Sequence, residues 1–155
     1  MQRFIENDKD KRYLYGCDIK DLNTFLNTQI SKSEWKNFST NTKEYLARHY
    51  GTEMDAVLKI ANENHPLLSQ RLNDDGEILV QAVYAVRNEM ALSLEDVLFR
   101  RTGIATLGDP GHEVLQKVAE VVAQELNWDQ AKIAEEIALV TTRLRIPSAY
   151  KMASE

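Results

Sequence analysis

Two adjacent arginines, Arg100 and Arg101, are the residues of this sequence whose placement most clearly calls for a chemical explanation. They follow the apolar residues 97–99 in a stretch that Ser93 opens as a helix cap. Asp96 lies three residues after Ser93, in the spacing of a capping box, and four residues before Arg100, in the order that favours an ion pair on one helix face. The spacing predicts a short capped helix that ends in two cations.

Two roles are open for these cations. If the turn between two helices brings Glu89 or Asp96 against an arginine in a partly dry setting, the ion pair fixes the helix crossing, and removing one partner costs about 3–5 kcal/mol. The alternative is a contact with an anionic group outside this domain. Trp128, just before a predicted helix start, either staples that start to the bundle or contacts a partner. The structural or interdomain candidates are Arg87, Glu89, Asp96, Arg100, Arg101 and Trp128.

Other residue types that support catalysis or metal binding lack the necessary partners. No histidine has a carboxylate or a second histidine at a metal-ligand spacing. The single cysteine, Cys17, excludes an internal disulfide, and the sequence places no histidine beside it to activate a thiol. Glu135 and Glu136 are neighbours, so on a helix they point about 100° apart and are expected to form a solvated face. The sequence assigns no catalytic, cofactor-binding or metal-binding residue.

The glycine-containing loop at residues 102–111 does not match a dinucleotide-binding motif, because its glycines have the wrong spacing and no strand pattern precedes them. Asp109 and Pro110 instead predict a helix that begins at residue 110, with the Asp109 side chain accepting hydrogen bonds from the first N–H groups. That carboxylate would repel phosphate, so an anion site at this helix start is disfavoured.

The composition predicts one domain with an acidic balance. The chain has 155 residues, 43% hydrophobic, and a net charge of -5, which leaves no basic surface for nucleic acid. Residues 1–51 carry nine Lys/Arg against seven Asp/Glu, whereas residues 52–155 carry ten against seventeen. No apolar run reaches the roughly 20 residues that span a bilayer, and the start is too charged for a secretory signal. We expect a soluble, cytoplasmic protein.

Apolar residues recur at intervals of three and four through most of the sequence, which is the period of one helix face. The pattern is strongest in residues 110–126 and 127–144. Residues 78–86 contain enough β-branched side chains for a strand to compete, but their length favours a helix. Asp18 is the predicted cap of the first helix and Asn127 that of the last. The sequence predicts an all-α fold, a compact bundle of about seven helices with no sheet.

Three separated motifs occur here in the order found in one known family. They are Arg48 with Tyr50 and Gly51, then YAVRNEM at 84–90 continued by LEDVLFRRT at 94–102, then NWD at 127–129. Together they resemble the C-terminal helical domain of FAD-dependent glycerol-3-phosphate dehydrogenases of the aerobic, quinone-linked kind. The resemblance covers about residues 43–145. YLYGCD at 13–18 also looks like the end of the connection from a flavin domain, with Cys17 where glycine is more usual.

The resemblance implies an accessory role in an oxidoreductase of glycerol metabolism. The parent enzymes of this family oxidise glycerol 3-phosphate to dihydroxyacetone phosphate, pass a hydride to FAD and then pass electrons to quinone at the membrane. Their catalytic and phosphate-binding residues lie in the preceding flavin/substrate domain, so none is transferred to this chain. The resemblance therefore implies no cofactor in this chain and FAD in the parent. It implies the flavin/substrate domain of the same polypeptide as partner, with a homo-oligomer left open.

The resemblance also divides the chain into three parts. Residues 1–40 are expected to be a linker and first helix after a missing flavin domain, residues 41–147 the C-terminal helical domain, and residues 148–155 a flexible tail. We expect a domain that is not catalytic by itself, with the parent enzyme peripheral to the cytoplasmic membrane. Two alternatives stay open: a free-standing helical protein-interaction module, and the same domain of a glycerol-3-phosphate oxidase.

Overall fold

The computed structural model describes residues 16–64 and 66–145, so the predicted tail and the first part of the predicted linker lie outside the described residues. Within these ranges the chain is helical, with one isolated β-bridge and no strand, which confirms the predicted all-α fold. The α-helical elements are α1 Leu22–Ser31, α2 Thr40–Tyr50, α3 Met54–Asn64, α4 Val80–Glu89, α5 Leu94–Asp96, α6 His112–Leu126 and α7 Gln130–Leu144. The 3-10 turns are η1 Ser33–Trp35, η2 Gly51–Glu53 and η3 Pro66–Ser69.

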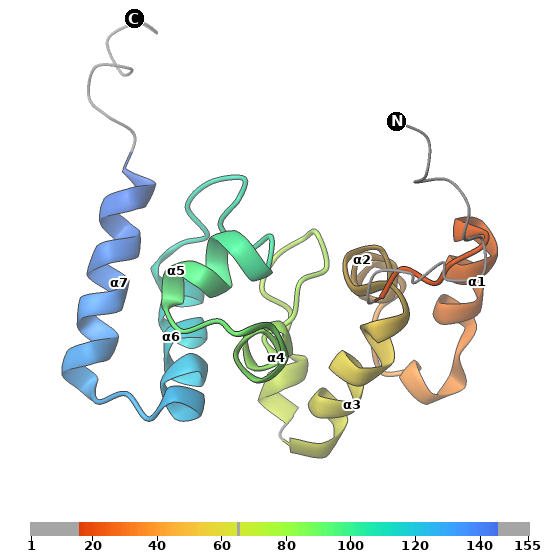
Figure 1. Ribbon diagram of the computed structural model, residues 1–155, viewed down its shortest axis with the longest axis horizontal. Helices are drawn as coiled ribbons and strands as arrows, with labels where there is room; N and C mark the ends of the chain where they lie inside the picture. Colours follow the sequence, from red (N-terminus) through yellow and green to blue (C-terminus); the bar gives the residue numbers. More distant parts are fainter. Residues whose placement is uncertain (1–15, 65, 146–155) are drawn as a thin grey trace, which may run out of the picture.

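The helices follow one another along the longest axis of the molecule (Figure 1). α1 packs on α2 at one end, α3 and α4 occupy the middle, and α6 packs on both α4 and α7 toward the other end. The short α5 contacts both α6 and α7. A hydrophobic core connects these layers, and its largest fully buried apolar side chains are Leu46, Met54, Leu58, Ile78, Leu94 and Leu98.

Two helices begin at caps that differ from those predicted. The carboxylate of Asp21, rather than that of Asp18, caps α1 by accepting a hydrogen bond of 2.7 Å from the N–H of Thr24. Asp129 caps α7, whereas Asn127 ends α6 in the left-handed conformation with φ of 56°. Asparagine is among the few residues besides glycine that tolerate this conformation, so Asn127 serves as a helix stop and leaves the next start to Asp129.

The predicted start of a helix at residue 110 was wrong by two residues. α6 begins at His112, and its cap position is Gly111, which has φ of 88° and makes no side-chain capping bond. The Asp109 carboxylate instead accepts a hydrogen bond of 2.9 Å from the N–H of Gly111, within the loop. A backbone with this φ favours glycine and lies outside the helical region, so the helix starts only after it.

Residues 78–86, for which strand and helix competed, are helical from Val80 onward. Only Ile78, paired with Arg71 in the isolated antiparallel bridge, has a strand-like contact. The β-branched side chains of this segment therefore do not make it a strand. As a helix, α4, it is long enough to pack against both α3 and α6.

The helix that carries the arginine pair is irregular in its second half. Ser93 and Asp96 form the predicted capping box, with Asp96 N–H donating to Ser93 Oγ at 3.1 Å and Ser93 N–H donating to Asp96 Oδ2 at 3.2 Å. After α5 the chain continues as a π-turn, Val97–Arg101, which Thr102 closes by donating its N–H to Val97 O at 3.0 Å. π-turns insert one residue into a helix and often accompany functional positions.

Candidate interdomain site

The first described residues are held against the corner between α2 and α3 by two glycines. Thr52 N–H donates to Gly16 O at 3.0 Å, and Gly51, with φ of 56°, approaches so closely that a Cβ there would lie 1.9 Å from Gly16 O. A Cβ on Gly16 would lie 2.8 Å from Tyr50 O. No other residue type fits such an approach without moving the backbone, so this pair of glycines is a clasp that fixes where the chain enters the domain.

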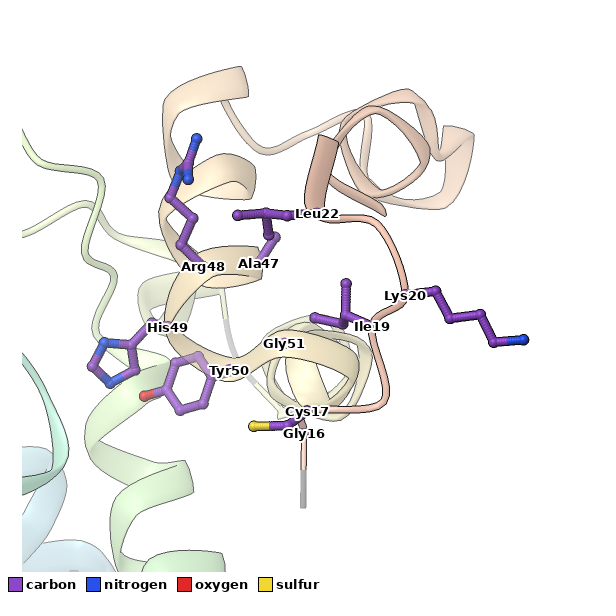
Figure 2. A pocket seen from close by; sticks show the side chains of 10 residues that line it. All are labelled: Gly16, Cys17, Ile19, Lys20, Leu22, Ala47, Arg48, His49, Tyr50 and Gly51. Atoms are coloured by element: carbon purple, nitrogen blue, oxygen red, sulfur yellow. The ribbon is translucent and has the colours of Figure 1, made fainter. Parts of the chain in front are cut away.

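A hollow of about 430 Å³ lies beside this clasp, between residues 16–22, which we call the entry segment, and the end of α2. Figure 2 shows Ile19, Leu22 and Ala47 turned toward one another, whereas Lys20 and Arg48 extend outward. None of the ten lining residues is acidic, although the chain as a whole is. The residues that line the hollow are Gly16, Cys17, Ile19, Lys20, Leu22, Ala47, Arg48, His49, Tyr50 and Gly51.

A second feature, which the sequence reasoning missed, is a carboxylate buried in the middle of the domain. Glu77 is only 1% exposed. Its Oε1 accepts hydrogen bonds from Tyr45 Oη at 2.6 Å and from Gly103 N–H at 2.8 Å, and its Oε2 accepts one from the Asn73 side-chain amide. These groups belong to α2, to the turn before α4 and to the loop after the π-turn. We call Glu77, Tyr45, Asn73 and Gly103 the Glu77 hub.

The Glu77 hub continues into a row of aromatic rings. His49 stacks on Tyr45 with ring centroids 5.7 Å apart and tilts against Tyr50 at 4.6 Å. Tyr50 meets Tyr84 of α4 edge to face at 5.3 Å, and its hydroxyl accepts a hydrogen bond from the buried Gln81 side chain. Burial raises the pKa of Tyr45 and of Tyr50 well above the usual range, so both hydroxyls stay protonated and can serve as donors.

Glu89, one of the predicted candidates, lies at the end of α4 with one oxygen buried. Among the described residues none donates a hydrogen bond to its Oε2. Burial raises the pKa of this carboxyl, and the nearby charges of His49 and Arg101 partly offset that rise. Arg101 thus acts on Glu89 through its charge, but no ion pair joins the two among the described side chains.

The arginines themselves lie at the surface. The Arg100 side chain is 57% exposed and pairs with Asp96 at 2.5 Å and with Glu95 at 2.9 Å. Burial alone raises the pKa of Asp96, but hydrogen bonds from Leu92 N–H and from Ser93, together with Arg100, hold it below the usual value. Arg101 is exposed and offers its backbone oxygen to His49 Nε2 at 3.2 Å. Exposed pairs of this kind contribute about 0–1 kcal/mol.

The remaining candidates join other helices. Arg87 makes two hydrogen bonds to Glu125 of α6, of 2.6 and 2.7 Å, and this contact raises the pKa of Arg87. Its partner is thus Glu125 and not the neighbouring Glu89. Trp128 is half-buried against the core at the turn between α6 and α7. For all six candidates the geometry is now known, while an interdomain role stays a prediction.

The expectation of a solvated Glu135–Glu136 face was wrong for Glu136. This residue is 6% exposed, and its Oε2 accepts a hydrogen bond of 2.9 Å from Leu94 N–H at the start of α5. Its Oε1 lies 2.9 Å from the Lys132 ammonium. Glu136 therefore caps a helix that is distant in the sequence, a contact that spacing within α7 does not reveal.

The described residues contain no cluster of three or more histidine, cysteine, aspartate or glutamate side chains that could hold a metal ion. In the same part of the chain, no helix has the length and apolar character needed to cross a membrane. The candidate site consists of the clasp, the hollow and the neighbouring row of rings and charges.

Comparison with known proteins places the chain in a family. A family model described as the C-terminal domain of alpha-glycerophosphate oxidase matches residues 10–133. The chain belongs to this family. The match includes the clasp, the Glu77 hub and the π-turn, and it begins before the predicted boundary at residue 40. That boundary stays a prediction, although Leu26, Trp35 and Phe38 share the core with the later helices.

Relatives of this C-terminal domain are found in bacteria and eukaryotes. The chain is 38% identical over 105 residues to glycerol-3-phosphate dehydrogenase 2 of Mycobacterium tuberculosis, covering 64% of this chain and 18% of the relative. It is 31% identical over 132 residues to a probable mitochondrial glycerol-3-phosphate dehydrogenase of Dictyostelium discoideum, covering 79% and 20%. Against the mitochondrial enzyme of Bos taurus it is 30% identical over 116 residues, covering 72% and 16%. The chain thus spans at most about a fifth of these relatives.

Proposed function

We propose that this chain is the accessory C-terminal domain of an FAD-dependent glycerol-3-phosphate dehydrogenase. In this proposal the preceding part of the polypeptide oxidises glycerol 3-phosphate to dihydroxyacetone phosphate and passes electrons to quinone. The observation that carries the proposal is the match of residues 10–133 to the family of C-terminal domains. The alignments with dehydrogenases, which cover only 16–20% of each relative, support it.

The described residues do not fit FAD, so the flavin is assigned to the preceding part of the parent. Dinucleotide sites place a glycine-rich turn between a strand and a helix, where backbone N–H groups meet the pyrophosphate. Here the loop after Arg101 leads from a π-turn into α6, and the cap position of α6 follows the carboxylate of Asp109. No step of the oxidation is therefore assigned to a residue of this chain.

The role that remains for the domain is to support its partner. Its partner in this proposal is the flavin/substrate domain of the same polypeptide, and any membrane contact, on the cytoplasmic face, is made through the parent. Whether quinone or oxygen accepts the electrons is decided outside this domain, so an oxidase parent is the alternative that the family description favours. The Glu77 hub supports this role, because its hydrogen bonds join three segments of the domain to one another.

The test begins with the gene. The reading frame upstream of Met1 should encode a strand–turn–helix with a Gly-x-Gly-x-x-Gly signature. The complete polypeptide should then reduce a dye acceptor when glycerol 3-phosphate is added, whereas the 155-residue chain should neither bind flavin nor turn over. Turnover by the 155-residue chain alone, or an upstream frame without a flavin motif, would overturn the proposal.

A further inference from the structure

The hollow beside the Gly16–Gly51 clasp has the composition of a small protein interface. Its centre is apolar, formed by Ile19, Leu22 and Ala47, and Leu22 remains 46% exposed although it is a large hydrophobic residue. Lys20 and Arg48 extend from its edge (Figure 2). An apolar centre with a polar rim is the usual arrangement of a protein–protein contact.

The charge of the hollow indicates what kind of surface would fit it. The lining contains Lys20, Arg48 and His49 and no carboxylate, in a chain whose net charge is -5. Of these residues, Arg48 pairs with Glu44 one turn earlier on α2, through an exposed contact of 2.8 Å that is easily exchanged. A partner that presents an apolar side chain flanked by carboxylates would match both the centre and the rim.

The position of the hollow indicates where that partner comes from. The family is one of C-terminal domains, so the rest of such a polypeptide reaches this domain through its entry segment. Gly16 and Cys17 of that segment are themselves part of the lining, and the clasp holds them against Gly51. The connection to a preceding domain therefore passes beside the hollow.

We propose that the hollow is the docking surface for the preceding domain of the same polypeptide, which inserts an apolar side chain with neighbouring carboxylates. This inference rests on the proposed function, because it needs a parent polypeptide. A small contact suffices, since a partner in the same polypeptide binds in an intramolecular step at a raised effective concentration. The clasp fixes the direction of the connection and so favours one arrangement of the two domains.

Cys17 provides a direct probe of this surface. It is the single cysteine of the 155-residue chain, it is exposed, and it lines the hollow. Alkylation by iodoacetamide would be followed by mass spectrometry of the peptide that contains Cys17, in the 155-residue chain and in the complete parent. We expect alkylation about tenfold slower in the parent, with matching protection of the backbone amides of residues 47–51 from hydrogen exchange.

Charge reversal tests whether the hollow itself causes the protection. Lys20→Glu with Arg48→Glu in the parent should restore the alkylation rate of the isolated chain. The matched control, Lys36→Glu with Arg145→Glu, changes the net charge equally at two exposed residues outside the lining and should leave the protection intact. Hydrogen exchange of α6, which contains none of the substituted residues, should be the same in all four proteins, which shows that the domain remains folded.

Each outcome bears on the proposal. Equal alkylation of Cys17 in the parent and in the isolated chain would overturn it, as would equal loss of protection in the reversed and control variants. If the parent oxidises glycerol 3-phosphate while Cys17 stays fully reactive, only the docking surface is wrong. If the upstream frame encodes no flavin domain, the proposed function and this inference are both wrong.

Discussion

The Glu77 hub and the arginine segment, residues 96–101, hold carboxylates in opposite ways. In the hub one buried carboxylate accepts three hydrogen bonds from uncharged donors, and each donor belongs to a different segment. In the arginine segment, one exposed cation, Arg100, pairs with two carboxylates about one turn away on its own helix. The hub therefore joins distant parts of the chain, whereas most contacts of the arginine segment are local.

The difference shows that opposite charge is a poor guide to the contact that fixes a helix crossing. A buried acceptor with well-aligned neutral donors is costly to disrupt, because each donor left without a partner costs about 1–3 kcal/mol. An exposed ion pair is screened by water and contributes about 0–1 kcal/mol. Three contacts in and beside the arginine segment reach further. Arg143 of α7 pairs with Glu95 and lies 4.7 Å above the Phe99 ring, and the Arg101 backbone oxygen lies 3.2 Å from His49 Nε2.

The largest effect should follow from removing the acceptor of the hub. Glu77→Ala leaves Tyr45, Asn73 and Gly103 without their common partner and should lower the free energy of unfolding by about 3–5 kcal/mol. Urea denaturation of the 155-residue chain measures this change. The matched control is Glu135→Ala, because the Glu135 side chain is 60% exposed. Its free energy of unfolding should stay within about 0.5 kcal/mol of that of the unmodified 155-residue chain. A loss below about 1 kcal/mol for Glu77→Ala would remove the distinction between the two regions.

The next effect concerns the close approach at Gly103. A Cβ there would lie 2.8 Å from Tyr45 Oη and 2.9 Å from Glu77 Oε1, so Gly103→Ala should cost about 1–3 kcal/mol through overpacking. Tyr45→Phe removes one of the two clashing oxygens. The cost of Gly103→Ala should therefore be smaller in the Tyr45→Phe background, which a double-mutant cycle by thermal or urea unfolding would show. Strict additivity would mean that the two side chains do not meet.

The arginine segment should respond weakly to the same treatment. Arg100→Ala and Arg101→Ala in the 155-residue chain should each lower the free energy of unfolding by no more than about 0.5–1 kcal/mol, because both side chains are exposed. Added salt should reduce the effect of Arg100→Ala further. A loss above about 2 kcal/mol for either variant would instead support the internal latch and would make the two regions alike.

The sequence predicted those elements whose signals are local. Period-3.6 patterns located α6 and α7, and the Ser93–Asp96 spacing gave a capping box that the structure contains. The predictions at Asn127 and Asp109 were wrong because residue types that cap the start of a helix also occur at the end of a preceding helix or in a loop. Asn127 ends α6, and Asp109 bonds within the loop, so only the backbone conformation distinguishes these roles.

The sequence did not reveal contacts between distant segments. Glu77 follows a turn and looks like any polar turn residue, and Glu136 looks like part of a solvated pair, yet both are buried. The available signals were weak: Glu77 directly precedes an apolar run, and Gly103 directly follows the motif that carries the arginines. The partners of Arg87 and Glu77 depend on helix crossings that periodicity does not specify.

The smallest effect is expected at Glu89, whose carboxyl we compare with that of Asp96 in the arginine segment. Burial raises the folded-state pKa of Glu89, with His49 of α2 and Arg101 of the π-turn as the charges that face it. A raised pKa means that its favourable contribution is complete below the unfolded value of about 4.3 and is lost as the pH rises through the folded value. Glu89→Gln, which stays neutral, should therefore raise the melting temperature at pH 7, and the gain should fade toward pH 4.

Asp96→Asn is the control of opposite sign for this measurement. The folded-state pKa of Asp96 is lowered by its hydrogen bonds and by Arg100, so its contribution is present at neutral pH and is lost as the pH falls through the folded value. Asp96→Asn should lower the melting temperature at pH 7 and converge on the unmodified chain in acid. If Glu89→Gln instead lowers the melting temperature at pH 7, the charged Glu89 carboxylate is stabilised by its surroundings as that of Asp96 is, and the opposite signs expected for these two residues are wrong.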